Sequence, residues 1–229
     1  FRRVLTSHSQ LHIPPETFVI NACYHKFRRF GRRLPWSELV ALLLAEFEFH
    51  PEFHTFQTWL GPLALRLKNC AQSDRNLAYV LNAFYRFHAE QHGTGQELRW
   101  GDKTPMNSLD DRLMRGDPPT HVGQGVPETL ERILEIFPDA QFLHIYRDGC
   151  DVIYSHLSGG FMNSLEEAST RWLHVIRQCK NFVARHHDRC HEVRYEDLIS
   201  APQEIVPGVC QFLDVEFEPS MTSSESSAT

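Results

Sequence analysis

The chain has 229 residues, of which 41% are hydrophobic and 23% are charged, and its formal net charge is −6. This length and composition are typical of one globular domain with a hydrophobic core, and they exclude a disordered or fibrous protein. The negative net charge disfavours a nucleic-acid partner, because nucleic-acid-binding proteins are usually basic. The sequence contains no run of about 18 apolar residues, so we expect no membrane span.

Positive charge gathers at the start of the chain. Residues 1–33 hold seven lysines and arginines and a single carboxylate, Glu16. Such a run could contact phosphates or an anionic surface, and it could equally be the solvated face of a helix. The sequence leaves both interpretations open.

Cysteines and histidines show little sign of a metal site. The six cysteines are scattered without CxxC pairs, which is typical of reduced thiols, and we expect a cytoplasmic protein. Histidines gather at residues 186–191, but this run lacks the second half of a zinc motif, which would complete the set of ligands. We interpret the run as a polar loop and predict no metal.

The first part of the chain is predicted to be mostly helical. Apolar residues at helical spacing predict helices at residues 1–6, 16–29, 37–49, 56–68 and 73–91, with a short strand end or loop at 9–15. Ser37 is a plausible helix cap, and Ser73 and Asn76 open the last of these helices. We expect the helical region 33–95 to form a lid or a wall on the acceptor side.

The second part alternates between strands and helices. A strand at 99–105 leads into a surface connection at 106–125, and the predicted elements that follow are a helix at 127–137, a strand at 141–147, helices at 150–157 and 164–186, a strand at 191–195 and a helix at 202–213. Apolar strands separated by helices predict an α/β fold with a mainly parallel sheet flanked by helices. We expect one domain over residues 1–219 and a disordered tail over 220–229.

The segment Tyr146–Ser155 places Arg147 directly after a predicted buried strand, where open α/β sheets bind their ligands. Gly149 permits a tight turn, and the N-terminus of the predicted helix that follows favours anions. Arg147 and Ser155 could therefore hold a phosphate, with the arginine as a two-pronged donor. A structural ion pair between Arg147 and Asp151 would explain the same residues.

Two further motifs place charged side chains beside prolines. In Trp100–Pro105 (WGDKTP), Lys103 stands at a predicted strand end, and a fixed cation there would suit a transferring anionic group. In Pro14–Thr17 (PPET), two prolines direct Glu16 at a predicted helix start, where negative charge is favoured. Lys103 could also be a surface lysine beside Asp102, and Glu16 could be an ordinary helix-start charge.

A fourth motif, Val193–Leu198 (VRYEDL), ends another predicted strand, and its Tyr195 could stack on a base or lie in the core. Taken in order, the four motifs resemble those of the sulfotransferases that use 3′-phosphoadenosine 5′-phosphosulfate (PAPS), in the group of bacterial sulfotransferase-like proteins and tyrosylprotein sulfotransferases. The similarity extends from about Phe1 to Pro219, and the pairing of FPDAQFLHIYRDGCDVIYS with RYEDL is its specific part. It implies the P-loop-NTPase-like sulfotransferase fold.

The resemblance implies a role for each matching residue. Arg147 and Ser155 would bind the 3′-phosphate of the donor PAPS, and Tyr195 would lie near its adenine. Lys103 would stabilise the sulfuryl group and the leaving oxygen, and Glu16 would accept the proton of an acceptor hydroxyl or amine. The acceptor could be a small molecule, a carbohydrate or a peptide.

The sequence departs from the family's pattern in three places. The first strand and its Arg-Ser-Gly-Thr loop, which should surround the 5′-phosphosulfate, would stand just before Phe1, and the residues after Met221 resemble no segment that closes over the donor. Gly159 occupies a position that is an arginine in the tyrosylprotein enzymes. Two hypotheses therefore follow: a sulfotransferase, or a truncated, non-catalytic relative with at most weak nucleotide binding.

Overall fold

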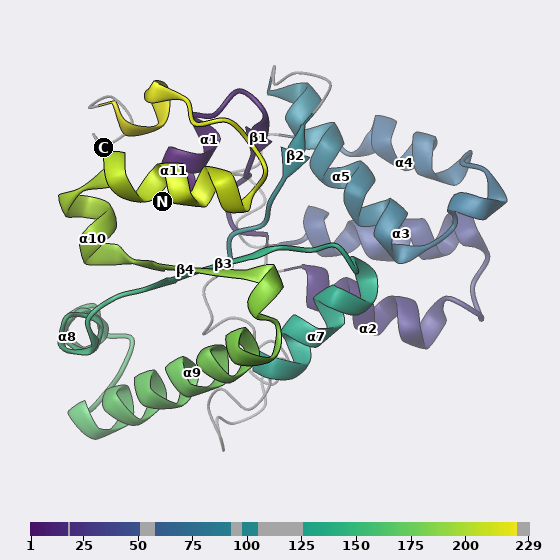
Figure 1. The fold of residues 1–229 in the computed structure, drawn as a ribbon. Coiled ribbons are helices and arrows are strands. Elements are labelled where there is room, and N and C mark those ends of the chain that lie inside the picture. The colour runs from purple at the N-terminus through teal and green to yellow at the C-terminus, as the bar shows by residue number, and fades with distance from the viewer. Residues whose placement is uncertain (18, 51–57, 93–97, 105–125, 224–229) are drawn as a thin grey trace. The chain divides into compact units, whose positions relative to one another are not determined.

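The computed structural model describes residues 1–17, 19–50, 58–92, 98–104 and 126–223 (Figure 1). Its contacts divide the chain into two compact units. The first, called here the N-terminal unit, comprises residues 1–104 and the short segment 135–137, and the second, the C-terminal unit, comprises most of the remainder to residue 223. The sequence-based expectation of one domain with a lid at 33–95 stays a prediction.

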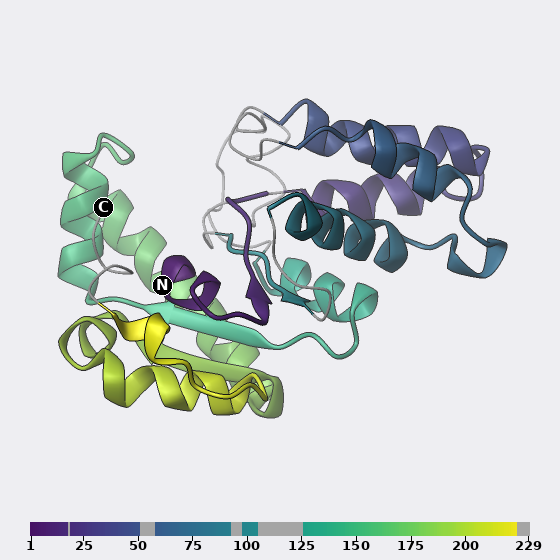
Figure 2. The same cartoon turned by 90° about the horizontal axis from the view of Figure 1, so that it is seen from above.

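The N-terminal unit is mainly helical. Its elements are α1 (Arg2–Thr6), β1 (Leu11–His12), α2 (Ile20–Phe30), α3 (Trp36–Glu48), α4 (Gly61–Lys68), the 3-10 turn η2 (Gln72–Asp74), α5 (Leu77–Gln91) and β2 (Arg99–Trp100). Helices α2, α3, α4 and α5 lie side by side (Figure 2). Apolar residues recur along α3 and α5 at helical spacing, so each helix turns one face to a shared core. At its centre the rings of Phe47 and Phe84 stack with their centroids 3.7 Å apart.

Strands β1 and β2 pair in parallel, with Leu11 beside Arg99 and His12 beside Trp100. The backbone N–H of Gly101 donates to the carbonyl oxygen of His12 at 2.9 Å. The pairing is short because Pro14 and Pro15 follow β1 and have no backbone N–H to continue a ladder. A loop therefore follows each strand: the loop after β1 carries Glu16, and the loop after β2 carries Lys103.

The C-terminal unit is built around a second parallel pair. Its elements are α7 (Val126–Ile136), of which the last residues belong to the other unit, β3 (Phe142–Tyr146), α8 (Gly149–Ser158), α9 (Leu165–Arg185), the 3-10 turn η4 (His187–Arg189), β4 (Cys190–Arg194), α10 (Tyr195–Ser200), α11 (Pro202–Phe212) and the 3-10 turn η5 (Pro219–Thr222). Strands β3 and β4 pair along their whole length, from Phe142 beside Cys190 to Tyr146 beside Arg194. Both strands therefore end at the same edge, where Arg147 and Tyr195 follow them.

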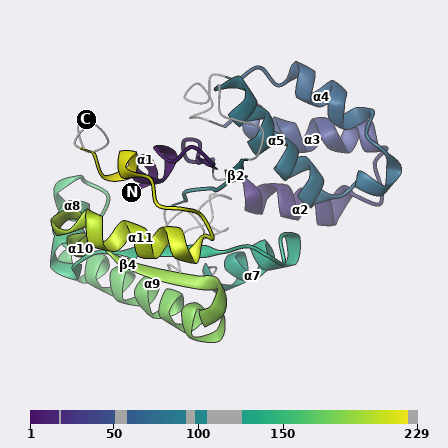
Figure 3. The same ribbon diagram turned by 45° about the horizontal axis from the view of Figure 1, so that its top comes forward.

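Helices cover both sides of the β3–β4 pair, with α9 on one side and α11 on the other (Figure 3). Phe142 packs on the buried Phe182 of α9, with ring centroids 5.0 Å apart. On the α11 side, the side-chain amide of Gln141 donates to the carbonyl oxygen of Phe212 at 2.7 Å. Parallel strands flanked by helices confirm the predicted α/β class. The predicted sheet is present, within the described residues, as two separate two-stranded pairs.

Several predicted boundaries were wrong. Helix α2 begins at Ile20 rather than at Glu16, because residues 16 and 17 are tied by their side chains to the loop after β2. Ser37 does not cap α3, which begins at Trp36 directly after Pro35. The prediction for Asn76 is confirmed, since its side chain accepts a hydrogen bond from the backbone N–H of Tyr79.

The end of the chain also differs from the prediction. Helix α10 was missed because its six residues are too few to show a helical period. Residues 219–222 form η5, although residues 220–222 were expected to be disordered. Met221 is fully buried beside Cys210, and the two sulfur atoms lie 3.6 Å apart. An apolar side chain with a place in the core keeps this turn ordered. The predicted connection at 106–125 and residues 224–229 lie outside the described residues. None of the described helices is both long enough and apolar enough to cross a membrane.

A buried histidine makes the stability of the N-terminal unit sensitive to pH. His12 in β1 is 4% exposed, and its Nε2 lies 2.8 Å from Nδ1 of His88. Burial, with smaller contributions from His92 and Arg2, lowers the pKa of His12 from its usual 6.5 to about 4. As the pH falls, His12 is therefore protonated near pH 6.5 in the unfolded chain but only near pH 4 in the folded chain.

We predict that the free energy of unfolding falls by about 2 kcal/mol from this group as the pH drops from 7.5 to 4.5. Urea unfolding at fixed pH values measures the slope. His12→Gln removes the titrating group, so this variant should be less stable at pH 7.5 but should lose less of its stability on acidification. A slope as steep as that of the wild type would contradict the assignment.

Candidate functional site

Glu16 and Lys103, which the sequence singles out separately, form an ion pair in the N-terminal unit between Oε1 and Nζ. Glu16 lies in the loop between β1 and α2, and Lys103 lies in the loop after β2. The Lys103 side chain is 50% exposed and that of Glu16 is 28% exposed, so both can meet a ligand. Partial burial, and to a smaller extent the nearby Arg2, lowers the pKa of Lys103.

A polar cluster that includes the buried Thr17 and Tyr85 lies next to this pair in sequence. Asp102 precedes Lys103, Thr17 follows Glu16, and the hydroxyl of Thr17 donates to Oδ1 of Asp102 at 2.8 Å. Tyr85 of α5 donates to the same oxygen at 3.0 Å, and Thr104 donates to Oδ2 at 2.6 Å. Burial raises the pKa of Asp102, and these hydrogen bonds oppose the rise. Lys103 is therefore the neighbour of a half-buried aspartate that accepts three hydrogen bonds, and its catalytic role stays a prediction.

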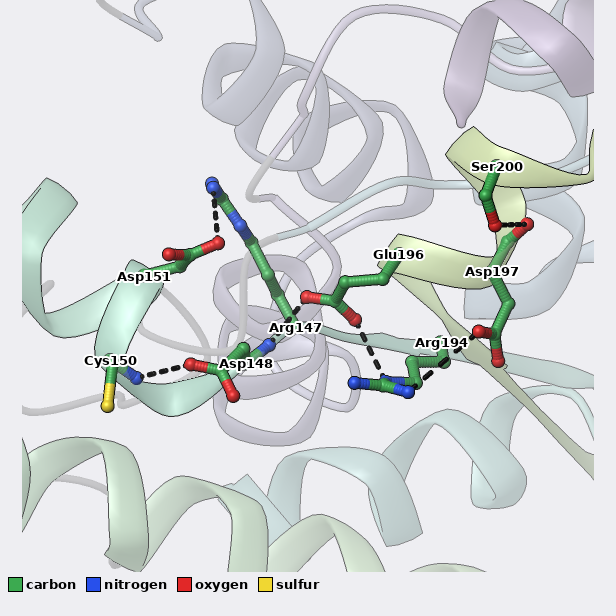
Figure 4. A network of polar contacts seen from close by, with 8 residues as sticks. All are labelled: Arg147, Asp148, Cys150, Asp151, Arg194, Glu196, Asp197 and Ser200. Carbon is green, nitrogen blue, oxygen red and sulfur yellow. Dashed lines mark hydrogen bonds and ion pairs between the residues drawn. The ribbon is translucent and has the colours of Figure 1, made fainter.

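Arg147 directly follows β3 in the C-terminal unit. Its Nη2 lies 3.0 Å from Oδ2 of Asp151 in the first turn of α8, and both side chains are exposed (Figure 4). Residues 151 and 155 are four apart in one helix, so Ser155 lies on the same face of α8 as Asp151. The structure thus contains the ion pair that the sequence offered as an alternative, and that pair holds the guanidinium over the helix face that carries Ser155.

Tyr195 completes this group from the neighbouring strand end. It is the first residue of α10, directly after β4, and it is half-buried. The centre of the Arg147 guanidinium lies 5.1 Å from the centroid of its ring. At this distance a cation over an aromatic face is attracted to it. Arg147 is therefore held from two directions, by a carboxylate of α8 and by the ring of Tyr195.

Glu196 connects the two strand ends through hydrogen bonds (Figure 4). Its Oε1 accepts from the backbone N–H of Asp148 at 2.8 Å, and its Oε2 pairs with Nε of Arg194 at 3.1 Å. The hydrogen bond from Asp148, with a smaller effect of the nearby arginines, lowers the pKa of Glu196. The RDG and YED motifs, distant in sequence, are thus bonded to one another at a single edge.

The N-terminus of α8 differs from the expected open anion site. Asp148 caps the helix by accepting a hydrogen bond from the backbone N–H of Cys150 at 2.9 Å, and Asp151 adds a second carboxylate to the first turn. These side chains already supply the negative charge that a helix N-terminus favours. A phosphate at this edge would meet the side chains of Arg147 and Ser155 rather than free backbone N–H groups.

The structure thus brings Glu16 to Lys103 in one unit, and Arg147 to Tyr195 in the other, with Ser155 one turn beyond Asp151 on α8. Among the residues that the structure describes, no three histidine, cysteine, aspartate or glutamate side chains are placed to hold a metal ion. Sequence reasoning missed Glu196 and the partners of Asp102. Thr17 and Asp102 adjoin the predicted catalytic residues, but nothing in the apolar periodicity of α5 marks Tyr85 as a polar contact.

Comparisons with known proteins identify the family of this chain. The family model described as "Sulfotransferase family" matches residues 1–219, so the chain belongs to the sulfotransferase family. It is 32% identical over 113 residues to a protein-tyrosine sulfotransferase of Drosophila melanogaster, a match that covers 44% of this chain and 22% of the relative. It is 26% identical over 112 residues to protein-tyrosine sulfotransferase 1 of Danio rerio, which covers 45% of this chain and 32% of the relative. These matches span less than a third of the relatives' length.

Two solved structures share the fold. The sulfotransferase domain from the curacin biosynthetic pathway aligns with a TM-score of 0.57 at 22% identity, over 96% of this chain and 70% of that one. The sulfotransferase domain from the Synechococcus PCC 7002 olefin synthase aligns with a TM-score of 0.61 at 19% identity, over 98% of this chain and 72% of that one. The predicted sulfotransferase fold is therefore confirmed.

Glycine is needed at the first residue of α8, Gly149, because the indole of Trp172 lies against it. A Cβ at this position would stand 2.8 Å from the nearest ring carbon. We predict that Gly149→Ala displaces the indole, changes the intrinsic fluorescence and lowers the free energy of unfolding by about 1–3 kcal/mol. Gly208→Ala in α11 is the matched control, since its Cβ meets nothing within 4 Å. It should be neutral or stabilising by about 0.5–1 kcal/mol. Equal effects of the two variants would contradict the role of Trp172.

Proposed function

We propose that this protein transfers a sulfuryl group from PAPS to a hydroxyl or amine of an acceptor. Membership of the sulfotransferase family supports the class of reaction. The single observation that carries the proposal is the ion pair of Glu16 with Lys103. It unites a carboxylate and an ammonium that stand far apart in sequence, and both remain partly exposed on loops.

The pair would supply the two groups that such a transfer needs. The Glu16 carboxylate would take the proton of the acceptor, whose oxygen or nitrogen forms the new bond to sulfur. The bond from sulfur to the donor's 5′-phosphate oxygen breaks, and adenosine 3′,5′-bisphosphate leaves. The Lys103 ammonium would stabilise the negative charge that develops on that oxygen. Positioning and charge stabilisation supply most of the catalysis in the comparable transfer of a phosphoryl group.

We assign the 3′-phosphate of the donor to Arg147 and Ser155, with Tyr195 beside them. The exposed guanidinium of Arg147 offers a charged fork to the 3′-phosphate, and the Ser155 hydroxyl on the same helix face adds a donor. A phosphate there has to share Arg147 with Asp151 or displace that carboxylate. Tyr195, already in contact with the guanidinium, would lie near the adenine.

The acceptor class to try first follows from the relatives. Both are named as protein-tyrosine sulfotransferases. The phenolic hydroxyl of a peptide tyrosine is a hydroxyl of the kind that the proposed chemistry uses, so we propose a peptide or protein acceptor. Carbohydrates and small phenols are the comparison acceptors for the same assay.

The nucleotide half of the proposal is tested by calorimetry with adenosine 3′,5′-bisphosphate. Arg147→Ala should weaken binding by about 10- to 100-fold, because a charge-assisted bond to the 3′-phosphate is worth about 1.5–3 kcal/mol. The matched control is Arg185→Ala in α9, which removes another exposed, ion-paired arginine of the same unit and should leave binding unchanged. Equal binding by the wild type and Arg147→Ala would refute the assignment of this edge.

The catalytic half is tested with isotope-labelled PAPS and a tyrosine-containing peptide. Glu16→Gln should lower kcat by about 10²- to 10⁴-fold, the usual contribution of a placed general base. Its affinity for adenosine 3′,5′-bisphosphate should stay unchanged. Glu46→Gln is the matched control, since Glu46 is also paired with a lysine, Lys26, in the N-terminal unit. If the wild type binds the bisphosphate but transfers nothing to any acceptor, the non-catalytic hypothesis holds instead.

A further inference from the structure

Glu16 and Lys103 both lie on loops, which by themselves position side chains poorly. The backbone pairing of β1 with β2 ends at the hydrogen bond from Gly101 to His12. Beyond that bond, one chain continues through Pro14 and Pro15 to Glu16, and the other continues through Asp102 to Lys103. Something other than the strand ladder must hold the two loops in register.

The next connection between the loops is made by side chains. We call the side chains of Thr17, Tyr85, Asp102 and Thr104 the Asp102 clasp. Thr17 and Tyr85 are both 0% exposed, and their hydroxyls lie 2.9 Å from one another as well as within bonding distance of Asp102. Asp102 itself is half-buried, and three hydroxyls supply the hydrogen bonds that its partly desolvated oxygens need.

The clasp is anchored in the helical core. Tyr85 stands on α5, and its ring stacks on Trp100 of β2 with centroids 4.0 Å apart and planes 4° from parallel. Trp100 is fixed in turn by a 2.8 Å hydrogen bond from its Nε1 to Asn82, one turn before Tyr85 on the same helix. Helix α5 thereby sets the position of Asp102. Glu16 directly precedes Thr17 in the chain, and Lys103 directly follows Asp102.

We propose that the Asp102 clasp positions the Glu16–Lys103 pair for the transfer of the sulfuryl group, an inference that rests on the proposed function. Thr17, Tyr85 and Asp102 are positioning residues, because they act on the reaction only through their neighbours. Misplacing a catalytic group by about 1 Å can cost roughly 100-fold in rate. Loosening the clasp should therefore reduce turnover while the binding of the donor's 3′-phosphate end is retained.

Thr17→Val tests this by removing one hydroxyl without changing the size of the side chain. We expect kcat with labelled PAPS and a tyrosine peptide to fall about 10- to 100-fold. The dissociation constant of adenosine 3′,5′-bisphosphate should change less than about 2-fold, because Arg147 is untouched. Thr17→Ser restores the hydroxyl and should recover most of the lost kcat. Val80→Ala opens a cavity in α5, on the helix that carries Tyr85, and controls for a general loss of stability.

Hydrogen exchange gives a second measurement that does not depend on turnover. In Thr17→Val, the amides of residues 16, 17 and 101–104 should exchange faster than in the wild type. The amides in the core of α3 and α5 should stay protected. Val80→Ala, by contrast, should speed exchange throughout the helical core. If the wild type transfers nothing but this local loosening is seen, the proposed function fails and the positioning of the two loops stands. The proposal is overturned if Thr17→Val keeps both kcat and local protection, or if Val80→Ala lowers kcat as much.

Discussion

The arrangement of the N-terminal unit depends on the hydrogen bonds of one carboxylate. Asp102 is half-buried, and a carboxylate partly withdrawn from water is stable only where its oxygens find donors. Thr17 comes from one loop, Thr104 from the other and Tyr85 from a helix, so satisfying Asp102 draws three segments together. The meeting of Glu16 with Lys103 is a consequence of that requirement.

In the C-terminal unit, charged side chains position the residues at the ends of β3 and β4. Glu196 accepts a backbone hydrogen bond from Asp148 across the gap between the ends of β3 and β4, and Asp151 holds Arg147. The Arg147–Asp151 pair is exposed to water, so it contributes little to stability. Its effect is geometric, because it fixes where a guanidinium points. An exposed pair can also open when a phosphate competes for the arginine, which a buried pair would resist.

The Glu16–Lys103 pair and the Arg147 edge are thus held by different kinds of contact, and each kind suits the role proposed for its residues. A group that reacts needs a fixed position, and a set of hydrogen bonds anchored on a packed helix supplies it. A group that binds and releases a nucleotide needs bonds that exchange readily with solvent. The exposed Arg147 and the half-buried Tyr195 meet that need.

The sequence by itself determined the family resemblance, the α/β class and the identity of Glu16, Lys103, Arg147 and Ser155 as the residues to watch, because these stand in short motifs at predicted strand ends. Local sequence also predicted most helices, through the 3.6-residue spacing of apolar side chains. Only the tertiary structure decided that Glu16 precedes its helix, that the cap of α8 is already filled and that Tyr85 serves Asp102. Those facts depend on contacts between segments distant in the chain, and local propensity carries no information about such contacts.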